Sequence, residues 1–392
     1  MIKKTVKKLL PKKLLKIVRT NILKRYGYDK DEFESQYKKG SIVLYISGKE
    51  TLFYQFMQWK KPFEELNKRT DIILVVRSYS MIRTVLHSNL HKTFNIAYKS
   101  SLNQLTSFYT EYKPTTILYV NNNVTNFQSL LYTKSYHIHL NHGESEKESM
   151  FSNQSKAYDY VLTVGKRGID RYRENLLNFD ENKYISIGRP QLDFIENFSF
   201  DVDTDKKIIL YAPTWEGFSE SMDYSSVEKF GVNLVKTILE SNQYTLIYRP
   251  HPNTGVRLDG ISKAHQEIKE MIHKHQDGYM ITDINIISLF TIVDFAFFDN
   301  SSVMIDYLHF NKPANYIEIQ KDTSLKYLTE AFNILKKSDM DKLINHIDHN
   351  LFEDSNKEKR EKIKQYYLGN YSEMESTNKF CDFMINLSSK VL

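Results

Sequence analysis

Short apolar runs alternate with longer amphipathic stretches along most of the 392-residue chain. The runs are rich in β-branched and aromatic residues, as buried strands are. In the first half they predict strands over residues 42–46, 72–76, 94–98, 116–120, 136–140, 160–164 and 184–187. In the second half they predict strands over residues 207–211, 244–248, 279–281, 293–298 and 315–319.

The stretches between these runs have helical periodicity, most clearly at 50–66, 227–240, 262–275 and 303–310. Strands that alternate with helices predict parallel sheets joined by right-handed crossovers. The chain is long enough for two domains, and the polar, strandless stretch 196–206 is the natural boundary. We therefore expect an α/β protein with two doubly wound, Rossmann-like domains, over 26–197 and 198–392, the second ending in helices.

Positive charge is concentrated at the N-terminus. Ten of the 54 Lys and Arg residues lie within residues 1–25, which contain no acid. The other 44 are outnumbered by 48 acidic residues, so the body carries a net charge of −4. A nucleic-acid groove needs basic residues on the folded body, so this distribution argues against nucleic acid as a partner.

Within residues 1–25, apolar residues recur near helical spacing between the lysines, and Pro11 is expected to divide the segment into two helices. The segment lacks the uninterrupted apolar run of a signal peptide or a membrane span. A basic amphipathic helix is typical of proteins that lie on an anionic membrane. We expect a cytoplasmic protein, peripheral on the inner face of the cell membrane; the alternative is a helix packed on the body with solvated lysines.

The sequence offers little for metal or redox chemistry. Its one cysteine, Cys381, lies in an apolar run and is expected in the core, without a disulfide. His137 and His139 alternate with apolar residues on one predicted strand and lack acidic partners at metal-binding spacing. No Gly-rich phosphate loop, nucleophile elbow or zinc motif is present. We expect no metal and no cofactor.

Three polar motifs follow predicted strands, where open α/β sheets bind ligands. Each motif brings groups that bind phosphate: an imidazole, then a guanidinium with a second imidazole in a proline-stiffened turn, then two hydroxyls. The motifs are Asn141-His142-Gly143, Arg249-Pro250-His251-Pro252 and Asp299-Asn300-Ser301-Ser302.

Several of these motifs belong to an ordered series that resembles one known family, the CDP-glycerol glycerophosphotransferases of teichoic acid and capsule synthesis. The resemblance covers about residues 136–320. Besides His142-Gly143, it rests on Gly188-Arg189-Pro190-Gln191-Leu192-Asp193, Leu210-Tyr211-Ala212-Pro213-Thr214-Trp215, Arg249-Pro250-His251-Pro252, Asp299-Asn300-Ser301-Ser302 with Asp306, and Asn311-Lys312-Pro313.

This resemblance implies a GT-B-like fold, with the two domains facing each other across a cleft. It also implies transfer of glycerol phosphate, or a related alditol phosphate, from a CDP-activated donor to a hydroxyl of a polyprenyl-linked or polysaccharide acceptor, with release of CMP. His142 is then the candidate base, since an imidazole suits proton transfer near neutral pH.

Other residues receive roles from the same resemblance. His251 is a second catalytic candidate and, with Arg249, suits the pyrophosphate. The remaining predicted substrate contacts lie at strand ends, in adjoining turns or one turn into a helix: Gly143, Lys147, Thr214, Asp299, Ser301, Ser302 and Asp306. Lys166 is a further candidate for acceptor phosphate.

Some positions near these motifs have other expected roles or depart from the family pattern. Arg189 and Asp193 are expected to link the domains, and Trp215 either walls the cleft or fills the core. Two positions depart from the family pattern: Glu144 follows His-Gly where Thr is usual, and Glu216 follows Trp215 where Arg is common.

Two other functional classes remain open at this point. A GT-B glycosyltransferase would use a nucleotide sugar for a surface glycan and would ignore CDP-glycerol. A membrane-bound scaffold with a decayed site would bind no nucleotide, and the intact His, Arg and Ser motifs count against it. CDP-ribitol also remains a possible donor.

Overall fold

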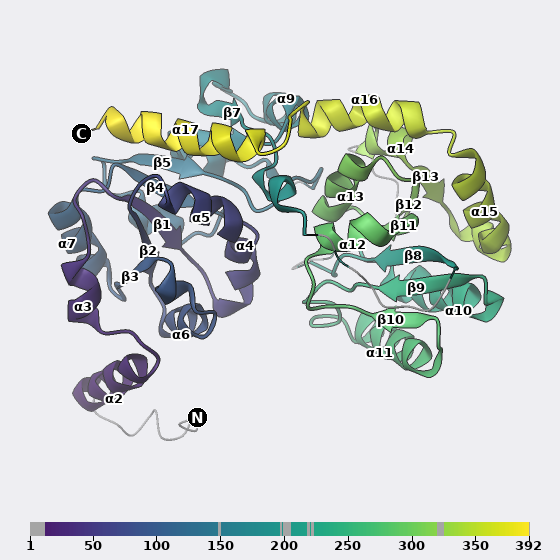
Figure 1. Ribbon diagram of the computed structural model, residues 1–392, viewed down its shortest axis with the longest axis horizontal. Coiled ribbons are helices and arrows are strands. Elements are labelled where there is room, and N and C mark those ends of the chain that lie inside the picture. The colour runs from purple at the N-terminus through teal and green to yellow at the C-terminus, as the bar shows by residue number, and fades with distance from the viewer. Residues whose placement is uncertain are drawn as a thin grey trace.

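The computed structural model describes residues 12–147, 150–196, 198, 205–217, 220, 223–319 and 325–391. These residues form two α/β domains, each built on one parallel sheet with helices on both faces (Figure 1). The predicted fold class is confirmed. The reason lies in the apolar runs: strands covered on both faces are buried at every position, as β1 and β2 are, and so are apolar throughout.

The first sheet has seven strands in the order β3-β2-β1-β4-β5-β6-β7. All seven correspond to predicted runs. Because the strand order reverses between β1 and β4, the loops that follow these two strands diverge and leave a crevice at their carboxyl ends. The strands are β1 (Ile42–Ile46), β2 (Ile72–Val76), β3 (Asn95–Tyr98), β4 (Thr116–Tyr119), β5 (Tyr136–His139), β6 (Tyr160–Thr163) and β7 (Tyr184–Ser186).

The helices of this half connect the strands and cover the sheet. The α-helices are α2 (Lys12–Arg25), α3 (Lys30–Ser35), α4 (Phe53–Met57), α5 (Lys60–Asn67), α6 (Tyr79–His87), α7 (Leu102–Tyr112), α8 (Asn126–Ser129) and α9 (Lys166–Asn175). Short 3₁₀ turns complete the connections: η1 (Glu50–Leu52), η2 (Leu90–Lys92), η4 (Asn153–Ala157), η5 (Glu181–Lys183) and η6 (Pro190–Phe194).

The second sheet has six parallel strands in the order β10-β9-β8-β11-β12-β13. Five correspond to predicted runs, and the sixth, β13 (Asn333–Leu335), is a short edge strand with only two apolar residues and was not predicted. The others are β8 (Lys207–Ala212), β9 (Tyr244–Tyr248), β10 (Gly278–Met280), β11 (Phe295–Phe298) and β12 (Ala314–Ile317).

Helices surround this second sheet and continue to the C-terminus. They are the π-helical turn η8 (Val227–Gly231), α10 (Val232–Ser241), α11 (Asp259–Lys274), α12 (Ile286–Ile292), α13 (Ser302–Tyr307), η9 (Leu308–Phe310), α14 (Leu328–Ala331), η11 (Lys337–Lys342), α15 (Leu343–Glu353), α16 (Lys357–Leu368) and α17 (Glu375–Ser389).

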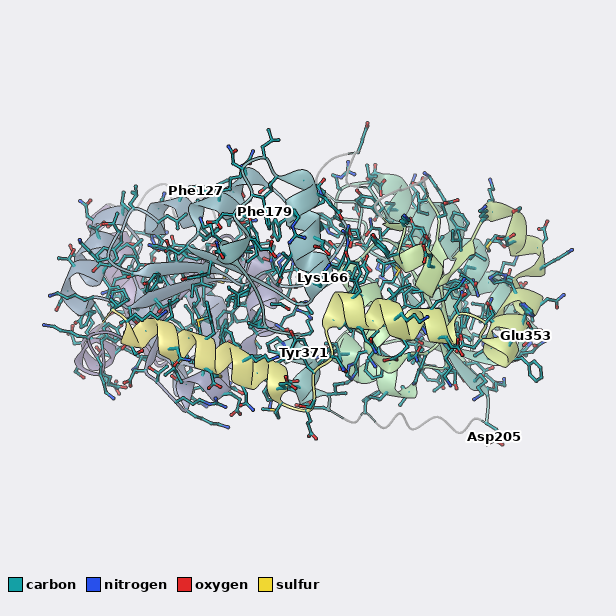
Figure 2. The ribbon with its side chains drawn as sticks, turned by 90° about the horizontal axis from the view of Figure 1, so that it is seen from above. Phe127, Lys166, Phe179, Asp205, Glu353 and Tyr371 are labelled. Atoms are coloured by element: carbon teal, nitrogen blue, oxygen red, sulfur yellow. The ribbon has the colours of Figure 1, made fainter. Side chains whose placement is uncertain are left out.

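The last two helices belong to different domains. Figure 2 shows α16 along the second domain and α17 along the first, with Tyr371 between them. Phe380, Cys381, Met384 and Leu387 of α17 are buried in the core of the first domain. This differs from the sequence-based boundary, which assigned all of 198–392 to the second domain. An amphipathic pattern shows that a helix has an apolar face, but it does not show which sheet that face covers.

The two predicted linking residues hold different parts of the chain together. Arg189 forms a buried, two-point ion pair with Asp306 of the second domain, with Nε–Oδ1 and Nη2–Oδ2 distances of 2.8 and 3.0 Å. Asp193 instead holds the start of α17, since its Oδ2 accepts the backbone N–H and the hydroxyl of Thr377 at 2.6 and 2.7 Å. Arg189 therefore joins the domains, and Asp193 anchors the returning helix.

The basic N-terminal segment is described only from Lys12, where α2 begins. Residues 1–11, with the predicted break at Pro11 and the first four lysines, lie outside the described residues. Leu23 is buried against the first domain and the Arg19 guanidinium lies 4.9 Å from the centre of the Tyr79 ring, whereas Leu14 and Ile17 are exposed. Among the described helices, none is long and apolar enough to cross a bilayer.

Candidate active site

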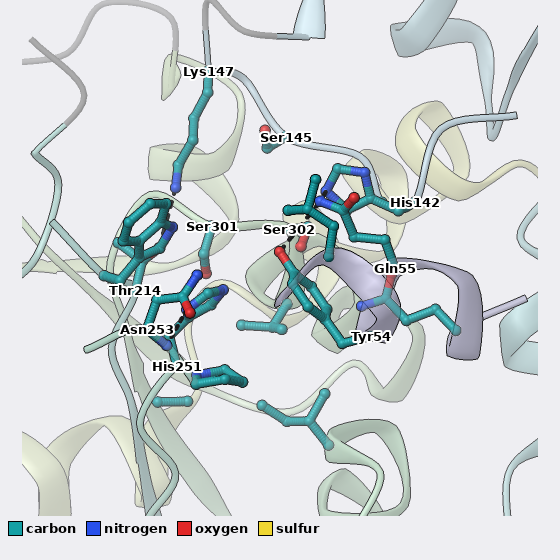
Figure 3. Close-up of a pocket in the computed structure, with 18 of the residues that line it drawn as sticks. Tyr54, Gln55, His142, Ser145, Lys147, Thr214, His251, Asn253, Ser301 and Ser302 are labelled. Atoms are coloured by element: carbon teal, nitrogen blue, oxygen red, sulfur yellow. Dashed lines mark hydrogen bonds between the residues drawn. The ribbon is translucent and has the colours of Figure 1, made fainter. Parts of the chain in front are cut away.

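A cavity of about 850 Å³ opens between the two domains at the carboxyl ends of their strands (Figure 3). Eight of the ten residues predicted for the site line it: Gly143, His142, Lys147, Thr214, Arg249, His251, Ser301 and Ser302. Asp299 and Asp306 are not among its lining residues. The strand-end motifs of the two sheets therefore meet in one place.

His142 follows β5 in a turn that the surrounding residues hold in place. Asn141 adopts a left-handed conformation with φ of 58°, and its carbonyl accepts the Trp59 indole N–H at 2.6 Å. Burial, together with the positive charges of Arg189 and Lys147, lowers the pKa of His142 to about 4. The imidazole is therefore neutral at physiological pH and has a free nitrogen to accept a proton.

A chain of side-chain amides determines which nitrogen of His142 is unprotonated. The backbone N–H of Asn123 donates to Oδ1 of Asn121 at 3.2 Å, so the Asn121 amino group faces Gln55 and donates to its Oε1 at 3.0 Å. The amino group of Gln55 then lies 3.4 Å from Nε2 of His142. Because an amide nitrogen only donates, Nε2 is the acceptor and the neutral ring carries its proton on Nδ1.

His251 has the opposite tautomer, with its proton on Nε2. Its Nδ1 accepts the backbone N–H of Asn253 at 3.1 Å, so the neutral ring carries its proton on Nε2 and donates. Burial is the main cause that lowers the pKa of His251, to about 3. The ring stacks on Trp215 at 5.7 Å, and the edge-on Tyr54 ring lies 5.8 Å from His251 and 6.4 Å from His142. Trp215 is thus a wall of the cavity.

Lys147 crosses from the first domain to the second. Its ammonium donates to the Thr214 hydroxyl at 3.1 Å, and burial lowers its pKa to about 8. Asp299 lies beneath this pair, with Oδ2 accepting the backbone N–H groups of Thr214 and Ser226 at 2.9 and 3.1 Å. Burial raises the pKa of Asp299 to about 7. Asp299 therefore supports Thr214 from behind and does not face the cavity.

The loop that carries Arg249 and His251 is fixed from two sides. The Arg249 guanidinium donates to the carbonyls of Thr282 and Ile284 at 2.7 and 3.0 Å. Glu216, which is fully buried, accepts the backbone N–H of Arg257 at 2.7 Å and that of Gly255 at 3.1 Å. Glu216, where Arg is common in the family, thus holds the loop of His251 against the end of the Trp215 motif.

The domains touch where Gly143 meets the serine pair. A Cβ on Gly143 would lie 3.0 Å from Cβ and 3.1 Å from Oγ of Ser302, so a larger residue there would require the Ser302 side chain to shift. Ser301 precedes α13 but makes no capping hydrogen bond through its side chain. Its buried hydroxyl has no hydrogen-bond partner within the described chain. The Ser301 hydroxyl is therefore available to a ligand.

Two predicted contacts lie elsewhere. Both carboxylate oxygens of Asp306 face Arg189, so the structure does not bring Asp306 to a substrate hydroxyl. Lys166 lies on α9, pairs with Asp170 at 3.0 Å and is mostly exposed outside the cavity. In both cases the charged side chain could bind a ligand, but it pairs instead with a neighbouring side chain of opposite charge.

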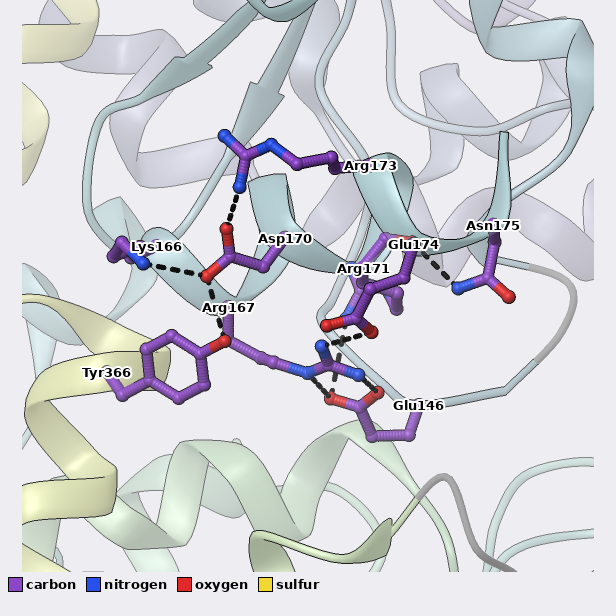
Figure 4. A network of polar contacts seen from close by, with 9 residues as sticks. All are labelled: Glu146, Lys166, Arg167, Asp170, Arg171, Arg173, Glu174, Asn175 and Tyr366. Carbon is purple, nitrogen blue, oxygen red and sulfur yellow. Dashed lines mark hydrogen bonds and ion pairs between the residues drawn. The ribbon is translucent and has the colours of Figure 1, made fainter. Parts of the chain in front are cut away.

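The acidic residues after His142-Gly143 anchor the loop to α9 (Figure 4). Glu146 accepts two hydrogen bonds from Arg167, at 2.9 and 2.7 Å, and Glu144 pairs with the buried Arg171. Glu144 also accepts the backbone N–H of Val164 at 3.2 Å. The carboxylates therefore point away from the cavity and hold the segment between His142 and Lys147.

Sequence reasoning missed one side of the cavity. Tyr54 and Gln55 reach it from α4, a short helix without any strand-end motif, and only packing brings them there. Asn121, Asn122 and Asn123 directly follow the β4 run, so their position at a carboxyl strand end was a signal that could have found them.

Comparison with solved structures bears on the fold. The wall teichoic acid polymerase TagF, in a structure soaked with CDPG, is 16% identical with a TM-score of 0.57, covering 96% of this chain and 97% of that one. A UDP-N-acetylglucosamine 2-epimerase from Neisseria meningitidis, bound to UDP-GlcNAc, is 14% identical with a TM-score of 0.57, covering 88% and 99%. These likenesses confirm the predicted GT-B-like arrangement of two facing domains.

Sequence comparison gives relatives of one kind. The teichoic acid glycerol-phosphate transferase of Staphylococcus aureus is 24% identical over 178 residues, which are 42% of this chain and 42% of that protein. The teichoic acid poly(glycerol phosphate) polymerase of Bacillus spizizenii is 27% identical over 180 residues, which are 42% of this chain and 41% of that protein. The match thus spans less than half the length of either relative.

A family profile extends the match over both domains and α17. The profile of the CDP-Glycerol:Poly(glycerophosphate) glycerophosphotransferases matches residues 28–386, from the segment before α3 to the last turn of α17. The matched range contains every strand of both sheets and every residue that lines the cavity. This chain therefore belongs to the CDP-glycerol:poly(glycerophosphate) glycerophosphotransferase family.

Proposed function

We propose that this protein transfers glycerol phosphate from CDP-glycerol to a hydroxyl of a cell-surface polymer precursor, with release of CMP. One observation carries the proposal: an imidazole that accepts at Nε2, His142, shares a cavity with groups that donate to anions, namely Lys147, His251 and Ser301. Family membership and the printed activities of the relatives support this reaction.

The chemistry follows from these roles. The acceptor hydroxyl attacks the β-phosphorus, a new P–O bond forms, and the bond from that phosphorus to the oxygen bridging to CMP breaks. The attacking hydroxyl replaces the Gln55 amide as the donor to Nε2 of His142, and Nε2 takes its proton and later releases it to solvent. Lys147 and Arg249 offset the negative charge on the diphosphate and on the departing CMP, and the neutral His251 donates its Nε2–H to a phosphate oxygen. Such charge stabilisation and positioning are the main contribution that a protein makes to phosphoryl transfer.

A donor screen tests the proposal. Purified protein is incubated with CDP-glycerol, CDP-ribitol or common UDP-sugars, and release of CMP or UDP is measured with and without a short alkyl-tailed acceptor. We expect release from CDP-glycerol. Release of UDP from a UDP-sugar, without release of CMP from CDP-glycerol, would support the nucleotide-sugar alternative. Failure of the protein to bind any of the donors would support a scaffold.

The N-terminal segment suits a polyprenyl-linked acceptor, because it would keep the enzyme on the inner face of the membrane. α2 exposes Leu14 and Ile17 beside lysines, and it has no acidic residue. We propose that this surface binds anionic lipid. Leu14→Glu with Ile17→Glu should reduce co-sedimentation with vesicles containing phosphatidylglycerol and spare CMP release with a small acceptor.

The matched control for the membrane test is Leu177→Glu, because Leu177 is also exposed but lies beyond α9. It should bind vesicles as the wild type does. Binding should weaken with salt, since the attraction between lysines and anionic lipid is screened within a Debye length. Equal binding of the double variant and the control would contradict the membrane proposal.

A further inference from the structure

The cavity has two walls of different chemistry. One wall, here called the amide wall, is formed by the η1–α4 segment and the loop after β4, and it consists of Leu52, Tyr54, Gln55, Met57, Gln58, Asn121, Asn122 and Asn123. None of these residues is ionisable near neutral pH. The other, here called the basic wall, consists of Lys147, Thr214, Trp215, Arg249, His251, Ser301 and Ser302.

His142 lies at the junction of the two walls. Its Nε2 faces the Gln55 amide at 3.4 Å, so a hydroxyl that donates to Nε2 must lie beside the amide wall. The basic wall is where the diphosphate of a donor finds its cations. The acceptor therefore approaches His142 along the amide wall, opposite the donor.

The chemistry of the amide wall restricts what can lie there. Carboxamides both donate and accept, which matches the hydroxyls of a polyol or a sugar, and Tyr54, Leu52 and Met57 match its carbon skeleton. A phosphate monoester placed there would lose water without gaining a cation. We infer that the amide wall is an acceptor subsite for an uncharged polyol or sugar unit and excludes a terminal phosphate. The inference rests on the proposed function.

The hydrogen-bond pattern indicates which amides contact the acceptor. Gln55 and Asn121 are engaged in the chain that ends at His142. Gln58 and Asn122 also line the cavity: Gln58 is exposed, and the buried Oδ1 of Asn122 has no hydrogen-bond partner among the described residues. Gln55 and Asn121 are therefore positioning residues, whereas Gln58 and Asn122 have unused capacity that acceptor hydroxyls can fill.

Two soluble acceptors test this subsite: an alkyl-tailed oligo(glycerol phosphate) ending in free glycerol, and the same molecule with a phosphate monoester on the secondary hydroxyl of that glycerol, which leaves the primary hydroxyl free to attack. The wild type should use the first and not the second. Gln58→Ala and Asn122→Ala should each raise the KM for the first acceptor about tenfold, the effect of one neutral hydrogen bond, with kcat within about twofold. Asn122→Lys should reduce the discrimination, because it adds a cation.

The matched control is Gln128→Ala, since Gln128 is an exposed amide on the nearby α8 and lies outside the cavity. Its KM should equal that of the wild type. The inference is overturned if Gln58→Ala and Asn122→Ala leave the acceptor KM unchanged, or if the wild type uses both acceptors equally or neither.

Calorimetry with CDP-glycerol separates this inference from the proposed function. All variants should bind CDP-glycerol as the wild type does, because the amide wall does not hold the diphosphate. If the wild type itself neither binds CDP-glycerol nor releases CMP from it, the proposed function is wrong, and the acceptor subsite is wrong with it. If donor binding is normal and only the acceptor results disagree, the acceptor subsite alone is wrong.

Discussion

The amide wall and the basic wall are held in place in different ways. Each polar group of the amide wall that reaches His142 is oriented by another side chain, in a chain that starts at a backbone N–H. On the basic wall the backbone orients the side chains directly: His251 through the N–H of Asn253, and Arg249 through the carbonyls of Thr282 and Ile284. The amide wall therefore depends on hydrogen bonds between side chains, whereas His251 and Arg249 on the basic wall depend on hydrogen bonds to the main chain.

This difference explains why the groups that carry the chemistry lie where the walls meet. His142 must stay unprotonated to act as a base, and burial and nearby cations both favour the neutral ring. Of the two cations that lower its pKa, Arg189 is paired with Asp306, whereas Lys147 lines the cavity and is also able to hold the donor. The division into two walls thus sets both the protonation state and the position of the candidate base.

The largest expected effect comes from removing the candidate base at the junction. His142→Ala should lower turnover by about 10² to 10⁴, as loss of a general base does, while CDP-glycerol affinity stays close to that of the wild type. Steady-state CMP release and calorimetry measure the two quantities. A variant with near-normal turnover would place the base elsewhere, and a variant with lost donor affinity would assign His142 to the basic wall.

Breaking the ion pair that joins the domains should act on stability instead. Asp306→Ala leaves the buried Arg189 uncompensated, so the free energy of unfolding should fall by about 3 to 5 kcal/mol in urea titrations. Glu196→Ala is the control, since Glu196 is exposed and its Oε1 is 3.7 Å from Lys61. That variant should unfold close to the wild type. Similar unfolding free energies for the two variants would show that other contacts hold the two domains, and with them the two walls, together.

A smaller effect is expected on the basic wall. Lys147→Ala removes a charge-assisted hydrogen bond and should weaken CDP-glycerol binding by about 1.5 to 3 kcal/mol. Lys166→Ala provides a comparison within the same domain, because Lys166 pairs with Asp170 outside the cavity and should leave the affinity unchanged. Calorimetry measures both. Unchanged affinity in Lys147→Ala would mean that the donor phosphates bind away from Lys147.

The sequence predicted the sheets well because buried parallel strands are almost purely apolar. β1, β2 and β9 have the predicted bounds. α17 was predicted as a helix, but its return to the first domain was not, since Phe380 and Leu387 would suit either core. The local pattern of apolar residues therefore identified the strands and helices, whereas long-range packing determined which domain α17 covers.

The candidate site was predictable to the extent that it lies at strand ends. The three motifs there gave most of the basic wall and His142. Asp306 shows the limit, because a carboxylate in a family motif was expected to bind substrate and instead faces Arg189. Gln55 shows another limit, since its contact with His142 depends on how α4 packs. Motifs identify residue types, whereas pairing between domains decides their partners.

The smallest expected effect is on the titration of His142, and it tests whether the two walls work together. In the free protein, burial and two cations hold the pKa of His142 near 4. A diphosphate on the basic wall would bring negative charge close to the ring and stabilise its protonated form. At about 7 Å and an effective dielectric constant of about 20, one such charge contributes roughly 2.4 kcal/mol, so the pKa should rise by about one to two units.

The sign of this shift has a consequence for binding. Because the pKa is higher in the complex, CDP-glycerol binding takes up protons, and donor affinity should increase as pH falls from the pKa of the complex towards 4. Imidazole ¹⁵N spectra with and without CDP-glycerol follow the titration. His346, on α15 and far from the cavity, should not change. If the donor binds and the His142 titration stays where it was, the diphosphate does not reach the junction, and the base and the basic wall belong to separate sites.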